Sequence, residues 1–115
     1  MTVADCYRQM GEDYKSVAER FGDDATVRYF CGRFLQDSSF SDLTDALKRG
    51  DAEAAFRAAH TLRGICLNLG FGQLGKAASE LTEQLRGRTM PDDADAYYSA
   101  VSQAYRRVAD ALSQL

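Results

Sequence analysis

Apolar residues recur at helical spacing along almost the whole chain, and this periodicity is the strongest constraint on its fold. Apolar positions three and four residues apart form one-sided stripes, which predict amphipathic α-helices. Glycines and short polar clusters interrupt the stripes, and Pro91 is the only proline. No stretch shows the alternation of β-branched and polar residues that indicates a strand. We therefore expect an all-α protein.

The interruptions divide the chain into four longer amphipathic segments and two or three short ones. Gly11 and Gly22 end the first two short segments, and either Asp23 or Asp24 can cap the helix that follows. The expected helices cover residues 3–10, 14–21, 24–35, 40–47, 51–69 and 72–86, and a last helix follows RGRTMPDD and extends to Leu115. Because each segment is apolar on one side and the connections are short, we expect an antiparallel up-and-down four-helix bundle with additional short N-terminal helices. Without a repeat or a linker, residues 1–115 are expected to form one domain.

Charge and composition argue against several classes of function. The net charge is −3, whereas a general binder of nucleic acid or anionic membranes needs a basic face. No apolar run approaches the roughly 20 residues that cross a bilayer. The stretch MTVADCYRQMGEDYK has no basic region followed by an apolar one, so we expect no signal peptide and a cytoplasmic location.

Two further sequence features lead to negative expectations. Cys6, Cys31 and Cys66 form no CxxC pair and fall at or beside apolar positions, so we expect buried, reduced thiols and no metal site. GFGQLG matches G-x-G-x-x-G, and GFGQLGK approaches the P-loop pattern. Both nucleotide-binding patterns require a preceding β-strand, and Ala77 replaces the metal-binding Ser or Thr of the P-loop. We interpret these glycines as a turn between two helices.

The stretch AAHTLRGICLNLGF, residues 58–71, contains His60, the only histidine. On a helix that turns about 100° per residue, the apolar stripe of the expected helix 51–69 lies roughly 100–180° away from His60. This stripe consists of Ala55, Ala59, Leu62, Cys66 and Leu69, with Ala58 and Ile65 at its far side. His60 is therefore expected to point away from the core. The wheel alone is also compatible with a second interpretation, in which His60 is an exposed surface histidine without a functional role.

The neighbours of His60 on the wheel favour a functional role. Gly64 lies one turn on, at a mid-helix position where glycine costs about 1 kcal/mol relative to alanine, and it leaves room beside the imidazole. Arg63 supplies a guanidinium, which can pair with phosphate through two parallel hydrogen bonds. Phe56 and Leu67 are expected to leave apolar surface on this face, as contact surfaces often do. Together these residues predict a histidine that carries phosphate and docks a protein.

The string His60-Thr61-Leu62-Arg63-Gly64, followed by Asn68-Leu69-Gly70, resembles the histidine-containing phosphotransfer (Hpt) family. The family pattern is roughly H-x-L-K/R-G with a further glycine downstream. The stretches YFCGRFLQDSSFSDLTDALKRGDAEAAFRAAH and LGFGQLGKAASELTEQL look like the flanking helices of that family. The resemblance covers roughly residues 11–87.

This resemblance implies a four-helix bundle whose exposed histidine accepts a phosphoryl group from the aspartyl phosphate of a receiver domain. The histidine then passes the group to the aspartate of another receiver. The implied partners are receiver domains of response regulators and hybrid histidine kinases, in a multistep phosphorelay. The resemblance also implies a phosphocarrier without its own ATP site and without a cofactor, because the receiver supplies the Mg²⁺. We expect a monomer.

The resemblance also implies roles for individual residues. His60 would be the phosphorylated nucleophile, Arg63 would take the place of the usual lysine and steady the phosphoryl group, and Gly64 would provide clearance. Some members place a glutamine or glutamate near the active imidazole, and the aligned residue here is Thr82, which could donate a hydrogen bond. The residues expected to contact the partner are Phe56, Arg57 and Leu67.

Two other functions remain as alternatives. A non-phosphorylated helical adaptor could bind receiver or kinase domains through the same face, although a pure binder would not need both His60 and Gly64. A hydrolase that uses His60 as a general base would need a pocket or a partner nucleophile, and a convex helix face offers neither.

Overall fold

The ends of the helices lie close to the boundaries that the sequence predicts. The computed structural model describes residues 1–115 as seven α-helices without a strand, which confirms the all-α prediction. The helices are α1 (Val3–Met10), α2 (Tyr14–Phe21), α3 (Asp24–Gln36), α4 (Ser39–Lys48), α5 (Ala52–Leu69), α6 (Gly72–Gln84) and α7 (Ala94–Leu112). Asp23 caps α3, because its carboxylate accepts a hydrogen bond of 2.7 Å from the backbone N–H of Thr26.

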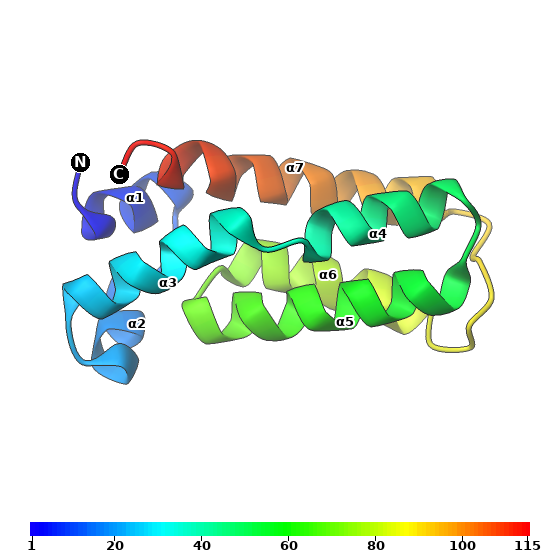
Figure 1. Cartoon of the computed structure of the whole chain (residues 1–115), viewed down its shortest axis with the longest axis horizontal. Helices are drawn as coiled ribbons and strands as arrows, with labels where there is room; N and C mark the ends of the chain where they lie inside the picture. Colours follow the sequence, from blue (N-terminus) through cyan, green and yellow to red (C-terminus); the bar gives the residue numbers. More distant parts are fainter.

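The last two helices differ from the predicted bounds. α6 ends at Gln84 rather than at Arg86, and α7 ends at Leu112 rather than at Leu115, whereas α7 begins at Ala94, directly after RGRTMPDD, as predicted. Residues 85–93 therefore form a single loop between them (Figure 1). This difference affects the candidate site, because the loop lies against the first half of α5.

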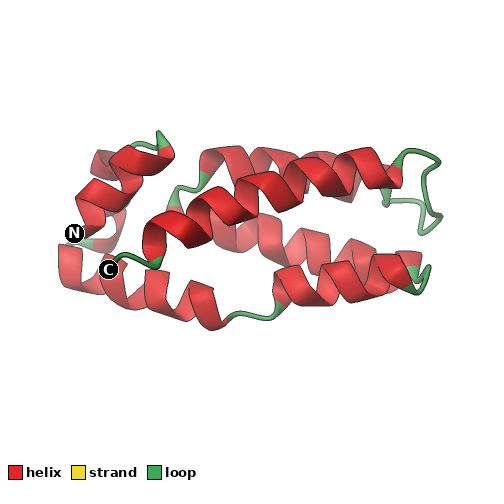
Figure 2. Cartoon of the chain, turned by 90° about the horizontal axis from the view of Figure 1, so that it is seen from above, coloured by secondary structure: helices red, strands yellow, loops and turns green.

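Four helices run antiparallel to their neighbours and form the predicted bundle. α4 packs on α5, α5 on α6, and α6 on α7, while α3 continues the line of α4 toward the end where both chain termini lie (Figures 1 and 2). Aromatic side chains join α4 to α7: the rings of Phe40 and Tyr105 stack with centroids 4.0 Å apart. The short helices α1 and α2 pack against α7 and α3. The prediction of a bundle with additional short N-terminal helices is confirmed.

The turn between α5 and α6 is fixed by contacts from the two N-terminal helices. Gly70 has a φ of 74°, and a Cβ there would overlap the side chain of Val17 in α2, so no other residue fits. The hydroxyl of Tyr7 donates a hydrogen bond of 2.5 Å to the carbonyl of Leu69. Arg20 donates to the carbonyls at the end of α5, where a cation also complements the helix dipole. The interpretation of GFGQLG as a helix–helix turn is confirmed.

The three cysteines are buried and unpaired, as predicted. Burial raises the pKa of Cys31 to about 11 and the pKa of Cys66 to about 12. These thiols are therefore packing residues of the core rather than nucleophiles. None of the seven helices combines the length and the apolar content that crossing a bilayer requires.

Candidate functional site

Helix α5 separates a core face from a face that carries His60. Its predicted apolar stripe is confirmed: Ala55, Ala59, Leu62 and Cys66 are fully buried, and Leu69 is nearly so. His60 is exposed on the other side. Asp51 caps the start of the helix by accepting a hydrogen bond of 3.0 Å from the N–H of Ala54. With both of its ends fixed, α5 presents His60 from a rigid element rather than from a loop.

Gly64 leaves open space one turn beyond His60. A Cβ built on Gly64 would meet no atom of the protein within 4 Å, and the residue is exposed in mid-helix. Its backbone does not have a positive φ, so the fold does not require glycine here. The structure therefore leaves open space at Gly64, where the sequence predicts clearance for a bulky group or a partner.

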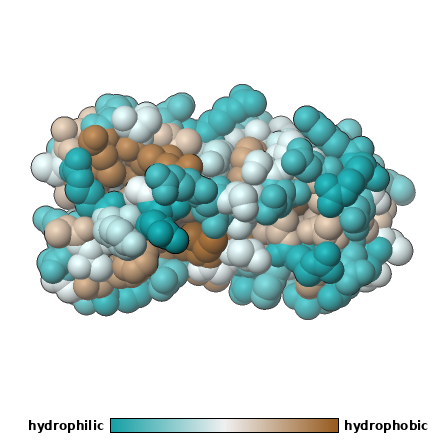
Figure 3. Space-filling model, in the orientation of Figure 1, coloured by the Kyte–Doolittle hydropathy of each residue, from teal (hydrophilic) through white to brown (hydrophobic).

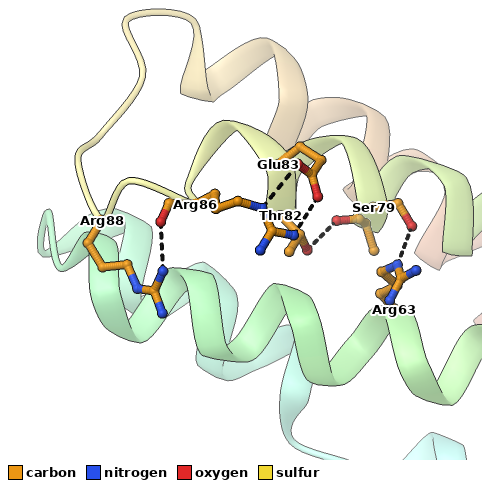
Figure 4. Close-up of polar contacts among 7 residues, drawn as sticks. Arg63, Ser79, Thr82, Glu83, Arg86 and Arg88 are labelled. Carbon is orange, nitrogen blue, oxygen red and sulfur yellow. Dashed lines mark hydrogen bonds and ion pairs between the residues drawn. The ribbon is translucent and has the colours of Figure 1, made fainter.

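Arg63 is held beside His60 by a residue of α6. Its Nε donates a hydrogen bond of 2.9 Å to the hydroxyl oxygen of Ser79 (Figure 4). Arg63 is half-buried and forms no ion pair. The nearby carboxylate of Glu83, whose pKa is lowered chiefly by its hydrogen bonds to Arg86 and also by the charge of Arg63, is bonded to Arg86 instead. No carboxylate therefore contacts the guanidinium of Arg63, and its terminal nitrogens can bind an anion.

The expectation that Phe56 leaves apolar surface beside His60 is wrong. Phe56 is only 9 % exposed, because arginines of the loop 85–93 cover its ring. The guanidinium carbon of Arg88 lies 3.9 Å from the ring centroid, and that of Arg86 lies 5.7 Å away. The same ring also stacks with the imidazole of His60: the two centroids lie 6.0 Å apart, and the angle between the ring planes is 9°. Phe56 is therefore a neighbour of the imidazole rather than a free contact surface.

Leu67 and Arg57 are exposed, as predicted. Leu67 is 49 % exposed and borders an open groove of about 1050 Å³ between α3 and the second half of α5. Gly64, Phe30 and Arg33 also line this groove, so it is continuous with the space beside His60. On the face of the molecule that Figure 3 shows, the most apolar areas lie over this half. Arg57 forms an ion pair of 2.9 Å with Glu53.

Thr82 does not make the hydrogen bond to His60 that its position could have allowed. The residue is buried, and its hydroxyl donates a hydrogen bond of 2.7 Å to the carbonyl of Ala78 in its own helix (Figure 4). The residue of α6 that contacts the site is instead Ser79, through Arg63. Neither Ser79 nor the loop arginines Arg86 and Arg88 could be assigned to the site from the sequence, since only the tertiary packing brings them to α5.

The comparison with known protein families agrees with this geometry. The family model of the Hpt domain matches residues 32–115, well over half of the chain. The match begins within α3 and contains α4 to α7, while α1 and α2 precede it. It therefore begins later and ends later than the resemblance over residues 11–87. The comparisons with curated proteins and with solved structures find no match. On the family match, this chain belongs to the Hpt domain family.

Proposed function

We propose that this protein is a phosphorelay intermediate that carries a phosphoryl group on His60. It accepts the group from the aspartyl phosphate of one receiver domain and passes it to the aspartate of another. The observation that carries this proposal is the combination on one exposed helix face of the only histidine, open space at Gly64 and the unpaired charge of Arg63.

The transfer follows from the chemistry of the imidazole. Neutral His60 attacks phosphorus with the lone pair of its unprotonated ring nitrogen. A phosphorus–nitrogen bond forms, the bond between phosphorus and the aspartyl oxygen breaks, and its electron pair remains on the aspartate carboxylate. The second ring nitrogen keeps its proton, so the first product is a phosphoimidazolium. Transfer to the next receiver reverses these steps.

Arg63 supports the transfer by electrostatics. Phosphoryl transfer depends on positioning and on stabilising the charge of the phosphoryl oxygens. The guanidinium of Arg63 lies one turn from His60 and is anchored through Nε to Ser79, which leaves its terminal nitrogens for the phosphoryl group. The Mg²⁺ that assists this chemistry belongs to the receiver domain, and members of the Hpt family are carriers without an ATP site of their own.

The receiver is proposed to dock on the face that contains His60, Gly64 and Leu67. Leu67 contributes exposed apolar area, and the adjoining groove extends the face toward α3. Such an apolar area surrounded by polar residues is typical of protein contact surfaces. Arg57 lies on the same side of α5 and could exchange Glu53 for an acidic group of the partner. We expect a monomeric carrier that acts in the cytoplasm.

The test is phosphotransfer profiling against the receiver domains of the source organism. Each receiver is first phosphorylated, then mixed with the wild-type protein or with His60→Gln, and the label on each protein is followed over time. We expect rapid, acid-labile labelling of the wild type by at least one receiver and no labelling of His60→Gln, whose helix content by circular dichroism is unchanged. Binding of a receiver without any transfer would instead favour the helical adaptor.

A further inference from the structure

The arginines near His60 differ in whether a carboxylate neutralises them. Arg57 pairs with Glu53 at 2.9 Å, and Arg86 makes two hydrogen bonds to Glu83, at 2.5 and 3.1 Å. Arg63 and Arg88 form no ion pair. No carboxylate contacts the guanidinium of either arginine, so both are available to an anion. The motif around His60 accounts for Arg63 but not for Arg88, which lies outside α5 and α6.

The loop between α6 and α7 holds Arg88 over α5. Its guanidinium donates a hydrogen bond of 2.6 Å to the carbonyl of Arg86 (Figure 4). The guanidinium carbon lies 3.9 Å from the ring centroid of Phe56. Arg88 has a φ of 58° and is the only residue other than glycine with a positive φ. Such a conformation is unfavourable for a residue with a side chain and tends to occur at functional sites. The neighbouring Gly87 could adopt a positive φ without strain, but in this loop the residue with a positive φ is Arg88.

Phe56 connects Arg88 to His60. The ring of Phe56 stacks on the imidazole with centroids 6.0 Å apart, and the guanidinium of Arg88 lies on the same ring. The guanidinium carbon of Arg88 can therefore lie no farther from the centroid of the imidazole than the sum of its distance to the Phe56 centroid and the distance between the two ring centroids. Phe56 lies one turn before His60, and Arg63 lies one turn after it, so the two unpaired cations flank the histidine from opposite ends.

We propose that Arg88, seated on Phe56, is a second residue whose positive charge stabilises the phosphoryl group on His60, from the side opposite Arg63. This inference rests on the proposed function, because it concerns the phosphorylated form of His60. The phosphoryl group adds negative charge at the outer edge of the imidazole, and the exposed guanidinium of Arg88 acts on that charge from its position on the face of Phe56. The cation–π contact with this ring holds the guanidinium near the imidazole both before and after phosphorylation.

The expected effect follows from the charges. A guanidinium about 6–10 Å from a doubly charged phosphoryl group in a largely aqueous setting contributes enough to change an equilibrium constant roughly three- to tenfold. Arg88→Ala should therefore shift the equilibrium of the phosphoryl group away from His60 and toward the receiver aspartate by about this factor. The difference from wild type should shrink at high salt, because salt screens exposed charges.

The experiment measures two quantities for each variant with one receiver that labels the wild type. The first is the equilibrium distribution of label between receiver and carrier, and the second is the affinity of the unphosphorylated carrier for the same receiver. Arg88→Ala should change the first and leave the second within twofold. Arg8→Ala is the matched control, because Arg8 lies on α1 at the far end of the molecule and its removal alters the net charge equally (Figure 1). It should change neither quantity.

Two further variants separate binding of the phosphoryl group from a structural role. Arg88→Lys keeps the charge and should retain most of the wild-type distribution. Phe56→Leu keeps an apolar side chain but removes the platform, so it should reproduce the loss of Arg88→Ala, and the double variant should lose no more. The proposal is overturned if Arg88→Ala leaves the distribution unchanged, or if receiver affinity falls by the same factor. Failure of the wild type to become labelled would instead refute the proposed function.

Discussion

Substituting Gly64 should make the protein more stable and a poorer phosphocarrier at the same time. A Cβ at Gly64 meets no atom within 4 Å, and its helical backbone accepts any residue. Alanine in place of an exposed mid-helix glycine gains about 0.5–1 kcal/mol in the free energy of unfolding. In a domain of this size that gain corresponds to a Tm higher by about 2–6 °C.

The same methyl group should slow phosphotransfer, because it occupies the space that the proposal assigns to the partner. Inserting a methyl group into a packed contact typically costs about 1–3 kcal/mol. At about 1.4 kcal/mol per factor of ten, the transfer rate from receiver to His60 should fall roughly fivefold to hundredfold.

Gly32→Ala is the matched control. Gly32 lies in mid-helix in α3 and is exposed, and a Cβ there would also meet no atom within 4 Å, but it does not line the groove beside His60. Thermal unfolding should show a similar gain in stability for both variants, whereas rapid-quench phosphotransfer should be slower for Gly64→Ala alone. The reasoning is refuted if Gly64→Ala transfers at the wild-type rate, or if it unfolds more easily than the wild type.

Other substitutions test other parts of the account. Arg63→Ala should reduce the amount of phosphohistidine at equilibrium by about tenfold while leaving receiver affinity nearly unchanged, and equal losses in both would make Arg63 a docking residue. Leu67→Ala should weaken receiver binding by about 1–2 kcal/mol in calorimetry, and unchanged affinity would contradict the docking face. Tyr7→Phe leaves the carbonyl of Leu69 without its partner, so denaturant unfolding should show a loss of about 1–3 kcal/mol. Because burial raises the pKa of Cys66 to about 12, its alkylation in the folded protein at pH 8 should be much slower than after unfolding, and equal rates would show that the thiol is accessible.

The sequence predicts the helices well because each apolar stripe has only one way to become buried. The stripe of α5 from Ala55 to Leu69 packs into the core as the wheel predicts, and Gly70 ends the helix where it comes against Val17. These features depend on local periodicity and on caps, and both can be read from neighbouring residues.

The parts of the site that the sequence does not predict depend on contacts across the fold. A helical wheel assigns Phe56 to the exposed face because it contains no information about what covers that face. The loop 85–93 does cover it, through Arg86 and Arg88. The sequence also does not show where the hydroxyl of Thr82 points. In the structure this hydroxyl donates a hydrogen bond within α6 rather than to His60. His60 and Gly64 can be proposed as site residues from the sequence because a lone outward-facing histidine and a mid-helix glycine are both unusual at such positions.

The most direct test of the central claim locates the phosphoryl group on the carrier after transfer from a cognate receiver. A phosphorylated receiver is mixed with the wild-type protein, the carrier is separated at neutral pH, and the modified residue is identified by fragmentation mass spectrometry. The account predicts that the modification is confined to His60 and that unlabelled receiver added afterwards removes it. Phosphate on any other residue, or modification of His60→Gln to the same extent, would contradict the account.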